Sequence, residues 1–498
     1  MKTYLLGGLG LALLTACAAE PAQDEAVDVQ SLQHQQGIHI PNFLPLPNPT
    51  GLAGTFDVTG RDVDLSGPFF TSLGTNGRSC GTCHQPTDGW TIIPDHLQIR
   101  FDLTGGTDPV FRLVDGANSP NADVSTVSKR RKAYSMLLNR GVIRIGLPMP
   151  AGAQFDLTTV DDPYHYASAA QLSLFRRPLQ SANLDYLSTV MWDGRETLVD
   201  TGTPLQPGDD CSKEPFPARC WHDLPFELAD QANQATLGHA QAMLGLTPPE
   251  EDQIVQFETS LYFGQEITYD AGLLDAAGAT GGPEAIAGYP QYFGDNDNFG
   301  DYQTGAAFTP IIFTDYNAWS GSHDRDRAAI ARGQALFNSK PITISGVGGI
   351  NNLKNREGVT VLPASFSGTC GTCHDVPGGG DHSVPAPLNI GISDASRRTP
   401  DMPLYTFTCN AVGVAAGACT AGQTVQSTDP GKGLLSGAFA DIGKFKGPTL
   451  RGIAARAPYF HNGSAADLGA VVDFYDTRFG IGFTKQERSD LIAFLSSL

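Results

Sequence analysis

The sequence predicts a mainly α protein of two domains connected by long loops, and three observations support this prediction. The pentapeptide Cys-Gly-Thr-Cys-His occurs twice, at residues 80–84 and 370–374. Apolar residues recur at helical spacing in the segments 323–339, 464–479 and 484–498. The 498 residues include 57 Gly and 34 Pro, while strand-like alternation is scarce, so irregular connections must be long.

The N-terminal segment 1–17 is predicted to be an export signal. A Lys is followed by an apolar stretch that is too short to span a membrane as a stable helix. The segment ends in Leu-Thr-Ala-Cys, which resembles a bacterial lipobox, so we expect Cys17 to be acylated. Ordinary cleavage near residues 18–19 is the alternative. The Gln-, Ala- and Pro-rich residues 18–55 then form a flexible tether, and the protein is expected in the periplasm of a Gram-negative bacterium, anchored by lipid to the outer membrane.

Each pentapeptide matches the attachment signature of a c-type haem, Cys-x-x-Cys-His. The two thiols bond to the porphyrin and the following His becomes an axial ligand of the iron. The sequence therefore predicts two covalently attached haem c groups, bound by Cys80, Cys83 and His84 and by Cys370, Cys373 and His374. One shared zinc site or a redox disulfide would also use such cysteine pairs, but neither explains the His that follows both times.

Two pentapeptides imply two cytochrome c-like haem domains. We place the first at residues 56–300, with an insertion at about 90–175, and the second at residues 301–498. The Gly- and Asp-rich stretch 277–302 is the expected junction. In the second domain a helix at 323–339 precedes the pentapeptide. The next helix, 464–479, has a capping-box-like start at Ser464 and Asp467, and the last, 484–498, has one at Thr484 and Glu487.

The remaining cysteines are even in number, which suggests disulfides in an exported protein. Local pairing, 211–220 and 409–419, is the economical choice among three connectivities. These four residues, Cys211, Cys220, Cys409 and Cys419, are therefore assigned a structural role.

The composition limits the partners. A formal net charge of −20 argues against nucleic acid, because binding the phosphate backbone requires Lys and Arg. An acidic protein would instead attract a positively charged partner protein. We expect contact with a membrane only through a lipid anchor, and the oligomeric state is unknown.

Three further segments, MWDGRETL at 191–198, LADQANQA at 228–235 and FKGPTLRGIAARAPYFHNGS at 445–464, closely resemble the di-haem cytochrome c peroxidase/MauG superfamily. The resemblance covers roughly residues 60–498, apart from 100–170. It implies that the His84 haem meets hydrogen peroxide and that the His374 haem stores or relays an electron. It also implies that Trp192 lies between the two haems, because an indole can hold a transient radical.

The resemblance also points to the second ligand of the C-terminal iron. Peroxidases of the usual type place a Met on the helix after the PYFH motif, where this chain has Tyr475. MauG-like members use Tyr there, and its hard oxygen favours oxidised iron. Tyr475 is therefore the expected ligand and Met402 the reserve candidate.

The first haem is expected to have a vacant distal side. Only His96 and His165 occur in the long segment between His84 and Trp192, and a closed state ligated by His96 is the alternative. By resemblance, Gln241 stands where the peroxidases have their catalytic Glu, and an amide cannot exchange protons. His239 is the nearest titratable substitute for moving the peroxide proton.

The block around the PYFH motif adds Arg451, which we expect to pair with a haem propionate, and His461, which we expect to hydrogen-bond near the second haem. A calcium ion between the domains is common in this family, but Arg176 occupies the matching position and would repel it. Calcium is therefore doubtful.

The sequence thus predicts an exported di-haem peroxidase whose electron donor is a small cytochrome c or cupredoxin. Two alternatives remain: MauG-like oxidation of a specific protein or organic substrate, and an electron carrier without peroxidase turnover.

Overall fold

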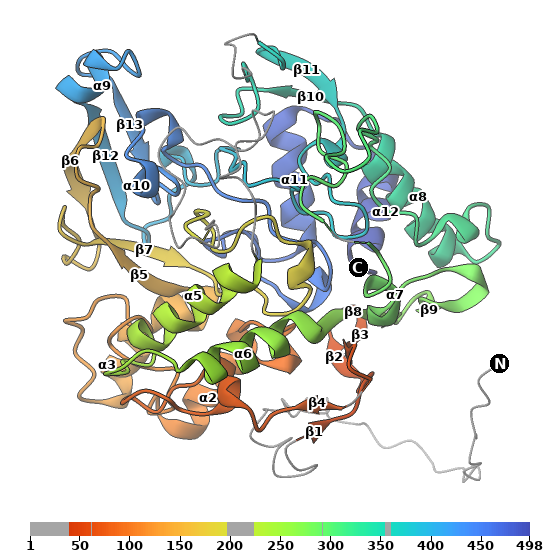
Figure 1. Cartoon of the computed structure of the whole chain (residues 1–498), viewed down its shortest axis with the longest axis horizontal. Helices are drawn as coiled ribbons and strands as arrows, with labels where there is room; N and C mark the ends of the chain where they lie inside the picture. Colours follow the sequence, from red (N-terminus) through yellow and green to blue (C-terminus); the bar gives the residue numbers. More distant parts are fainter. Residues whose placement is uncertain (1–38, 61, 197–223, 291, 354–359) are drawn as a thin grey trace.

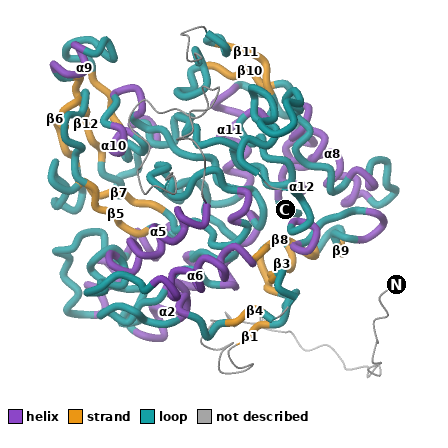
Figure 2. Tube along the Cα trace, viewed as in Figure 1, coloured by secondary structure: helices purple, strands orange, loops and turns teal. Residues whose placement is uncertain are grey.

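The computed structural model describes residues 39–60, 62–196, 224–290, 292–353 and 360–498. It is 31% helical with 18% strand, so a mainly α chain is not confirmed. Loops connect nearly all elements, as expected from the Gly and Pro content (Figure 2). The strands were missed because they are only two to eight residues long, too short to leave a clear alternation in the sequence.

The helices and strands follow each other in chain order. The strands are β1 (His39–Ile40), β2 (Leu46–Asn48), β3 (Gly51–Asp57), β4 (Val63–Asp64), β5 (Ile143–Leu147), β6 (Phe155–Asp161), β7 (Leu172–Arg176), β8 (Leu261–Thr268), β9 (Gly272–Leu273), β10 (Ile342–Ser345), β11 (Ser365–Gly368), β12 (Leu404–Cys409) and β13 (Thr424–Ser427). The α-helices are α2 (Pro94–Thr104), α3 (Val127–Ala133), α4 (Ser135–Arg140), α5 (Leu224–Gly238), α6 (Pro248–Ser260), α7 (Pro283–Ile286), α8 (Arg325–Ser339), α9 (Ala411–Ala415), α10 (Gly433–Ser436), α11 (Leu468–Phe479) and α12 (Lys485–Leu495).

Helices α8, α11 and α12 lie on one side of the molecule, and α2, α3, α5 and α6 on the other (Figure 1). The predicted helix at 323–339 is confirmed as α8, which begins after Asp324; the Asp324 carboxylate accepts the backbone N–H groups of residues 326 and 327. At the start of α12, Thr484 and Glu487 form the predicted reciprocal cap. Helix α11 differs, because its N-cap is Asp467, which accepts the N–H of Ala470 at 2.8 Å, and not Ser464.

Two large apolar cores correspond to these two sides. One contains buried residues of α8, α11 and α12, such as Phe337, Val472 and Phe494. The other gathers around β3, α6 and the start of β8, with Trp90 and Phe263 fully buried. Each core lies close to one pentapeptide, because Cys370 packs against the first core and Cys80 against the second.

Contacts between the N-terminal and C-terminal halves cross the predicted division at residue 300. Strand β6, in the insertion, pairs antiparallel with β12 of the C-terminal half, with Phe155 opposite Cys409. This three-stranded sheet, β13-β12-β6, stands at one edge of the molecule (Figure 1). Ala271 and Leu274, before the expected junction, pack into the C-terminal core. The two-domain division therefore stays a prediction, and the two halves share a sheet and a hydrophobic core.

Within the described ranges, no helix has both the length and the apolar composition needed to cross a membrane.

Candidate functional site

Both pentapeptides fold into the same local structure. Each begins with a single 3₁₀ turn, Cys80–Thr82 and Cys370–Thr372. In each turn the Thr hydroxyl accepts the backbone N–H of the residue before the first Cys, at 3.0 Å. The backbone N–H of the His then donates to the carbonyl of that Cys, at 3.0 Å for His84 and 3.1 Å for His374. The turn therefore gives the two thiols and the imidazole a fixed mutual arrangement.

The two imidazoles are held as iron ligands require. Nδ1 of His84 lies 3.0 Å from the carbonyl oxygen of Trp90, and Nδ1 of His374 lies 2.5 Å from that of Gly380. An Nδ1–H that donates to a carbonyl leaves the Nε2 lone pair free for a metal. Burial lowers the pKa of His84 to about 4 and also lowers that of His374, so both rings are neutral at pH 7.

The thiols do not fit the two alternative uses of a Cys-x-x-Cys pair. Burial raises the pKa of Cys80 to about 12 and that of Cys370 to about 12, whereas a redox-active Cys needs a lowered pKa. The two pairs also line different cavities, so they do not form one four-cysteine zinc site. Among the described residues no group of three or more metal-binding side chains is present.

Each pentapeptide opens onto its own cavity. The first cavity has a volume of about 500 Å³ and is lined by Cys80, Cys83 and His84. The second has a volume of about 210 Å³ and is lined by Cys370, Cys373 and His374. Both walls are mostly apolar, but the first includes five arginines and the second includes two, Arg177 and Arg456. The five arginines of the first wall are Arg78, Arg144, Arg176, Arg177 and Arg195.

Two buried arginines in the cavity walls have no carboxylate partner among the described residues, which is compatible with a bound group that carries carboxylates. Arg177 lines both cavities and donates only to the carbonyls of residues 92, 140 and 456. Arg456 lines the second cavity and likewise donates only to carbonyls. Burial lowers the pKa of each to about 10, because nothing nearby compensates the charge. Haem propionates would supply the missing anions.

Trp192 lies in the wall that the two cavities share. It is one of four residues that line both, together with Arg177, Pro178 and Leu179. Its indole N–H donates to the carbonyl of Arg177 at 2.7 Å, and its ring meets the edge of His461 with the centroids 6.2 Å apart. Trp192 thus lies between the two cavities, and its place between two haems stays a prediction.

Tyr475 and His461 line the second cavity with His374. Burial raises the pKa of Tyr475, and no hydrogen bond of its hydroxyl is found among the described residues. His461 stacks on Phe445 with the centroids 4.0 Å apart, and its Nε2 atom is buried without a partner. Burial lowers the pKa of His461 to about 4. The expected hydrogen bond of His461 near the second haem stays a prediction.

Met402 does not reach the second cavity. It is buried in a small apolar cluster with Met136, Val142 and Phe175. The reserve ligand is therefore excluded by its packing, and Tyr475 is the candidate that faces the cavity.

On the other side of the first cavity, His239 lies in the wall at the end of α5. Its Nδ1 is 2.5 Å from a carboxylate oxygen of Asp115, and the other oxygen of Asp115 accepts from Arg78. Burial opposes the charged form of Asp115, but His239 and Arg78 outweigh it and lower the pKa. Asp115 therefore holds the His239 ring with Nε2 free.

Three other candidates lie away from the first cavity. Gln241 is exposed and its amide oxygen accepts from Asn76 at 3.2 Å, so it is not the catalytic group. His96 is bonded to Asp88 and does not line the cavity, and neither does His165. The closed state ligated by His96 is thus not supported in this conformation.

The role expected for Arg451 is corrected by the structure. Arg451 is fully buried, lines neither cavity, and donates to Asp315 at 2.8 Å and to the carbonyl of Gly378. Burial opposes its charge, but Asp315 raises its pKa. A guanidinium already neutralised by a carboxylate has no reason to bind a propionate, and Arg177 and Arg456 fit that role better.

Arg176, the residue at the doubtful calcium position, is an ion-pair centre. Its guanidinium bonds Asp429 at 2.7 and 2.9 Å and Asp193 at 2.7 Å, and all three side chains are buried. Arg195 also donates to Asp193, at 2.9 and 2.6 Å, so two guanidinium groups neutralise the two carboxylates.

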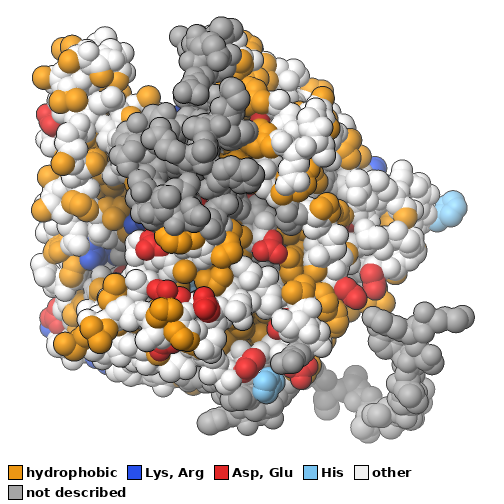
Figure 3. Space-filling view, viewed as in Figure 1, with side chains coloured by type: hydrophobic (Ala, Val, Ile, Leu, Met, Phe, Trp, Pro, Cys, Tyr) orange, Lys and Arg blue, Asp and Glu red, His pale blue; other side chains and the backbone are white. Residues whose placement is uncertain are grey.

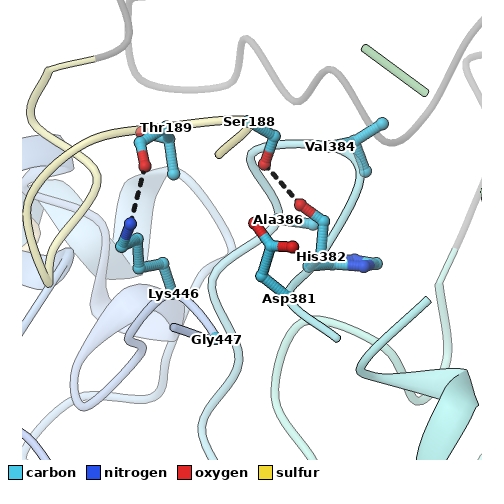
Figure 4. Close-up of a pocket in the computed structure, with 8 residues that line it drawn as sticks. All are labelled: Ser188, Thr189, Asp381, His382, Val384, Ala386, Lys446 and Gly447. Carbon is cyan, nitrogen blue, oxygen red and sulfur yellow. Dashed lines mark hydrogen bonds between the residues drawn. The ribbon is translucent and has the colours of Figure 1, made fainter. Parts of the chain in front are cut away.

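A third cavity of about 10 Å³, the size of one water molecule, lies between segments of both halves (Figure 4). Lys446 spans it: its Nζ donates to the carbonyl of Thr189 at 2.8 Å and its backbone N–H to that of Trp192 at 2.9 Å. The carboxyl group of Asp381 faces the same space, with one oxygen unpartnered. Burial raises the pKa of Asp381 and lowers that of Lys446 to about 8. Lys446 thereby ties the Trp192 segment to the C-terminal half.

The structure joins Cys409 and Cys419 in a disulfide, the local pairing that the sequence favoured. Cys17, Cys211 and Cys220 lie outside the described residues.

Comparison with known proteins gives three relatives. Cytochrome-c peroxidase IdrP1 of Pseudomonas sp. (strain SCT) is 33% identical over 148 residues, which are 27% of this chain and 38% of that protein. IdrP1 of Denitromonas iodatirespirans is 32% identical over 148 residues, with the same coverage, and its IdrP2 is 28% identical over 165 residues, 31% of this chain and 42% of that protein. Over these residues the chain resembles proteins named cytochrome-c peroxidase, in agreement with the family that its motifs indicated.

The similarity covers only part of the relatives, which limits how far their activity can be assigned to this chain. The matches span only about two fifths of the relatives' own length. No family model matches the chain. A crystal structure of a MauG-like protein associated with microbial copper homeostasis is similar at 16% identity over 93% of both chains, with a TM-score of 0.33. The relatives named cytochrome-c peroxidase imply haem c as the cofactor.

Several residues of the candidate sites were missed by sequence reasoning. Asp115, Arg144 and Arg177 stand in no segment that the sequence singled out for chemistry, and Glu258 lies on α6. Arg456 stands in the segment 445–464, but no role was predicted for it. Glu258 lines the first cavity with one oxygen unpartnered, and burial raises its pKa to about 8. Only the convergence of distant segments on one cavity identifies these residues.

Proposed function

We propose that the protein is an exported di-haem c-type oxidoreductase that reacts with hydrogen peroxide at the first cavity and relays electrons through the second. The observation that carries this proposal is the position of Trp192, in the wall common to two cavities that each contain a Cys-x-x-Cys-His turn. Bound haem supplies an iron that can bind and reduce peroxide and exchange single electrons.

The haem ligands follow from the two turns. His84 and His374 present Nε2 because their Nδ1–H groups are taken by backbone carbonyls. The four cysteines of the turns attach the two porphyrins, and Arg177 and Arg456 hold the propionates.

Proton movement at the first cavity is assigned to His239. A neutral imidazole with free Nε2 takes the proton from the inner peroxide oxygen and returns it to the leaving oxygen. Asp115 keeps the Nδ1–H in place and stabilises the imidazolium that forms, at 2.5 Å. Asp115 is thus a positioning residue.

Tyr475 is proposed as the second ligand of the C-terminal iron. It faces the second cavity with His374, and Met402, the alternative, is buried elsewhere. A Tyr ligand favours oxidised iron, which supports a second candidate function, MauG-like oxidation of a specific protein or organic substrate.

The electron donor is proposed to be a small, positively charged redox protein, a cytochrome c or a cupredoxin. The chain carries a net charge of −20, and acidic side chains are visible on the face that carries α5 and α6 (Figure 3). The protein is proposed to reside in the periplasm, anchored through Cys17.

The test is to add hydrogen peroxide to the fully ferric protein without a donor and to follow the Soret band. An immediate change supports an open first haem and a second haem that stores charge. A change only after one haem is pre-reduced supports a gated peroxidase of the usual kind. No reaction in either state, together with no binding of cyanide or carbon monoxide, would mean an electron carrier without turnover.

A further inference from the structure

The first cavity is larger than the second. Since the second cavity is proposed to hold one haem, the first has space beyond that of one haem. Both cavities are built on the same turn and receive the same group, yet the first has about 500 Å³ and the second about 210 Å³. Part of the wall of the first cavity comes from the insertion in the N-terminal half, and this part is called the additional wall. It consists of Val114, Asp115, Ile143, Arg144, Ile145, Gly146, Leu147 and Gln171.

Arg144 is the cation in this additional wall. It lies in β5, between Ile143 and Ile145, and is 5% exposed. Its backbone N–H donates to the carbonyl of Asp115 at 2.7 Å, and its Nη2 donates to the carbonyl of Val114 at 3.1 Å. Its Nε and Nη1 atoms are buried without any hydrogen-bond partner. The backbone therefore fixes the position of the side chain while leaving two donors unused.

The acidic groups near Arg144 are engaged elsewhere. The Asp115 carboxylate bonds His239 and Arg78, and the Asp162 carboxylate accepts the N–H groups of residues 164, 166 and 167. The Tyr166 ring, 5.2 Å from the guanidinium carbon, gives a cation–π contact. Within the described part of the chain no carboxylate pairs with Arg144.

An unpaired buried guanidinium is costly, which is why buried charges are normally paired. In the same cavity, Arg78 and Arg176 follow this rule with Asp115, Asp193 and Asp429. Burial lowers the pKa of Arg144, as expected for a cation that lacks an anion. An anion that enters the cavity would remove this penalty.

We propose that Arg144 anchors a carboxylate-binding subsite in the first cavity. The flanking Ile143, Ile145 and Leu147 line the same space and suit an apolar body behind the carboxylate. Two sources carry this chemistry, a propionate of the first haem and a small organic acid that enters the cavity. The extra volume favours the organic acid. The inference rests on the proposed function only in that the first cavity is taken to contain a haem.

The test uses the full-length protein with both haems attached and sodium benzoate as the probe. Benzoate binding is measured by calorimetry for the unchanged protein and for the variants Arg144→Met, Arg144→Lys and Arg131→Met. Charge-assisted hydrogen bonds of this kind correspond to roughly a 10- to 100-fold change in affinity. We expect Arg144→Met to weaken binding by that factor and Arg144→Lys to retain most of it. The matched control Arg131→Met, in the same insertion but exposed and paired with Asp102, should bind benzoate normally.

A redox titration of the first haem, without benzoate, separates the two sources. Lost benzoate binding in Arg144→Met with an unchanged midpoint potential identifies a free organic acid. A lowered potential in Arg144→Met, in a protein that never bound benzoate, identifies a propionate. The subsite is overturned if Arg144→Met changes neither benzoate binding nor the potential. Benzoate binding that depends on Arg144 in a protein inert to peroxide would refute the proposed function and leave the subsite standing.

Discussion

Each cavity contains one copy of the same pentapeptide, Cys-Gly-Thr-Cys-His, but the side chains opposite the pentapeptide differ between the two cavities. The first cavity, of about 500 Å³, includes His239, Asp115 and five arginines in its wall. Around the second, Tyr475 and apolar side chains close a space of about 210 Å³. The local turn determines where a haem attaches, whereas the opposite wall determines which reactions the haem can undergo.

The difference also suggests which cavity suits the reaction with a small substrate and which suits electron transfer. A polar cavity with a partly exposed histidine suits a small polar reactant and proton exchange. A smaller apolar cavity suits a group that only gains and loses electrons. Trp192 and Arg177, in the shared wall, are the residues through which the two sites would communicate.

The most direct way to break this comparison is to remove one attachment site at a time. We expect Cys80→Ala/Cys83→Ala to lose about half of the covalently bound haem and all reaction with peroxide. Cys370→Ala/Cys373→Ala should lose the other half but still bind cyanide at the first haem. Haem staining after denaturing electrophoresis and absorption spectroscopy measure both quantities. Peroxide reactivity confined to the second site would reverse the assignment.

A substitution at His239 sharpens the role of the first wall. His239→Gln removes the imidazole that is proposed to move the proton and should slow the peroxide reaction by roughly 100- to 10,000-fold, the usual contribution of a general acid–base group. Stopped-flow measurement of the Soret change gives the rate. Gln241→Ala, at the exposed neighbour, is the control and should react at the normal rate. Equal rates for both variants would remove His239 from the mechanism.

The corresponding test in the second cavity is Tyr475→Phe. Axial ligands tune haem potentials over several hundred millivolts, so we expect the second haem to shift by on the order of 100 mV or more. Its oxidised-state spectrum should also change. Tyr459→Phe, which lines the same cavity but bonds the carbonyl of Ile453, is the matched control. An unaltered spectrum and potential in Tyr475→Phe would show that the hydroxyl does not bind iron.

Arg176 tests how far the charged wall of the first cavity contributes to stability. Removing one partner of a buried pair leaves an uncompensated charge, so Arg176→Met should lower the free energy of unfolding by about 3–5 kcal/mol at pH 7. Although burial favours the neutral acids, Arg176 lowers the pKa of Asp193 and of Asp429. The stabilisation by these carboxylates is therefore present above about pH 4 and is lost as the pH falls. Denaturant titrations between pH 3 and pH 7 should show this loss in the unchanged protein and a smaller one in Arg176→Met.

The sequence by itself determined the features that depend on neighbouring residues. The two Cys-x-x-Cys-His turns, the helix at 323–339 and the Thr484 cap each follow from a few adjacent side chains and their backbone. The capping-box-like start predicted from Ser464 and Asp467 was wrong in its position, because Asp467 is itself the N-cap.

Only the tertiary structure decided the features that join distant segments. Asp115 lies 124 residues from His239, and β6 pairs with a strand about 250 residues away, so no local pattern reports either contact. Arg451 was assigned to a haem because of its motif, yet burial beside Asp315 satisfies its charge first. The proposed role of Arg144 depends on the cavity that it lines and on the pairing of the nearby carboxylates with other groups. The physical reason is that charge pairing and cavity shape depend on the packing of the whole chain, whereas caps and attachment turns depend on a few successive residues.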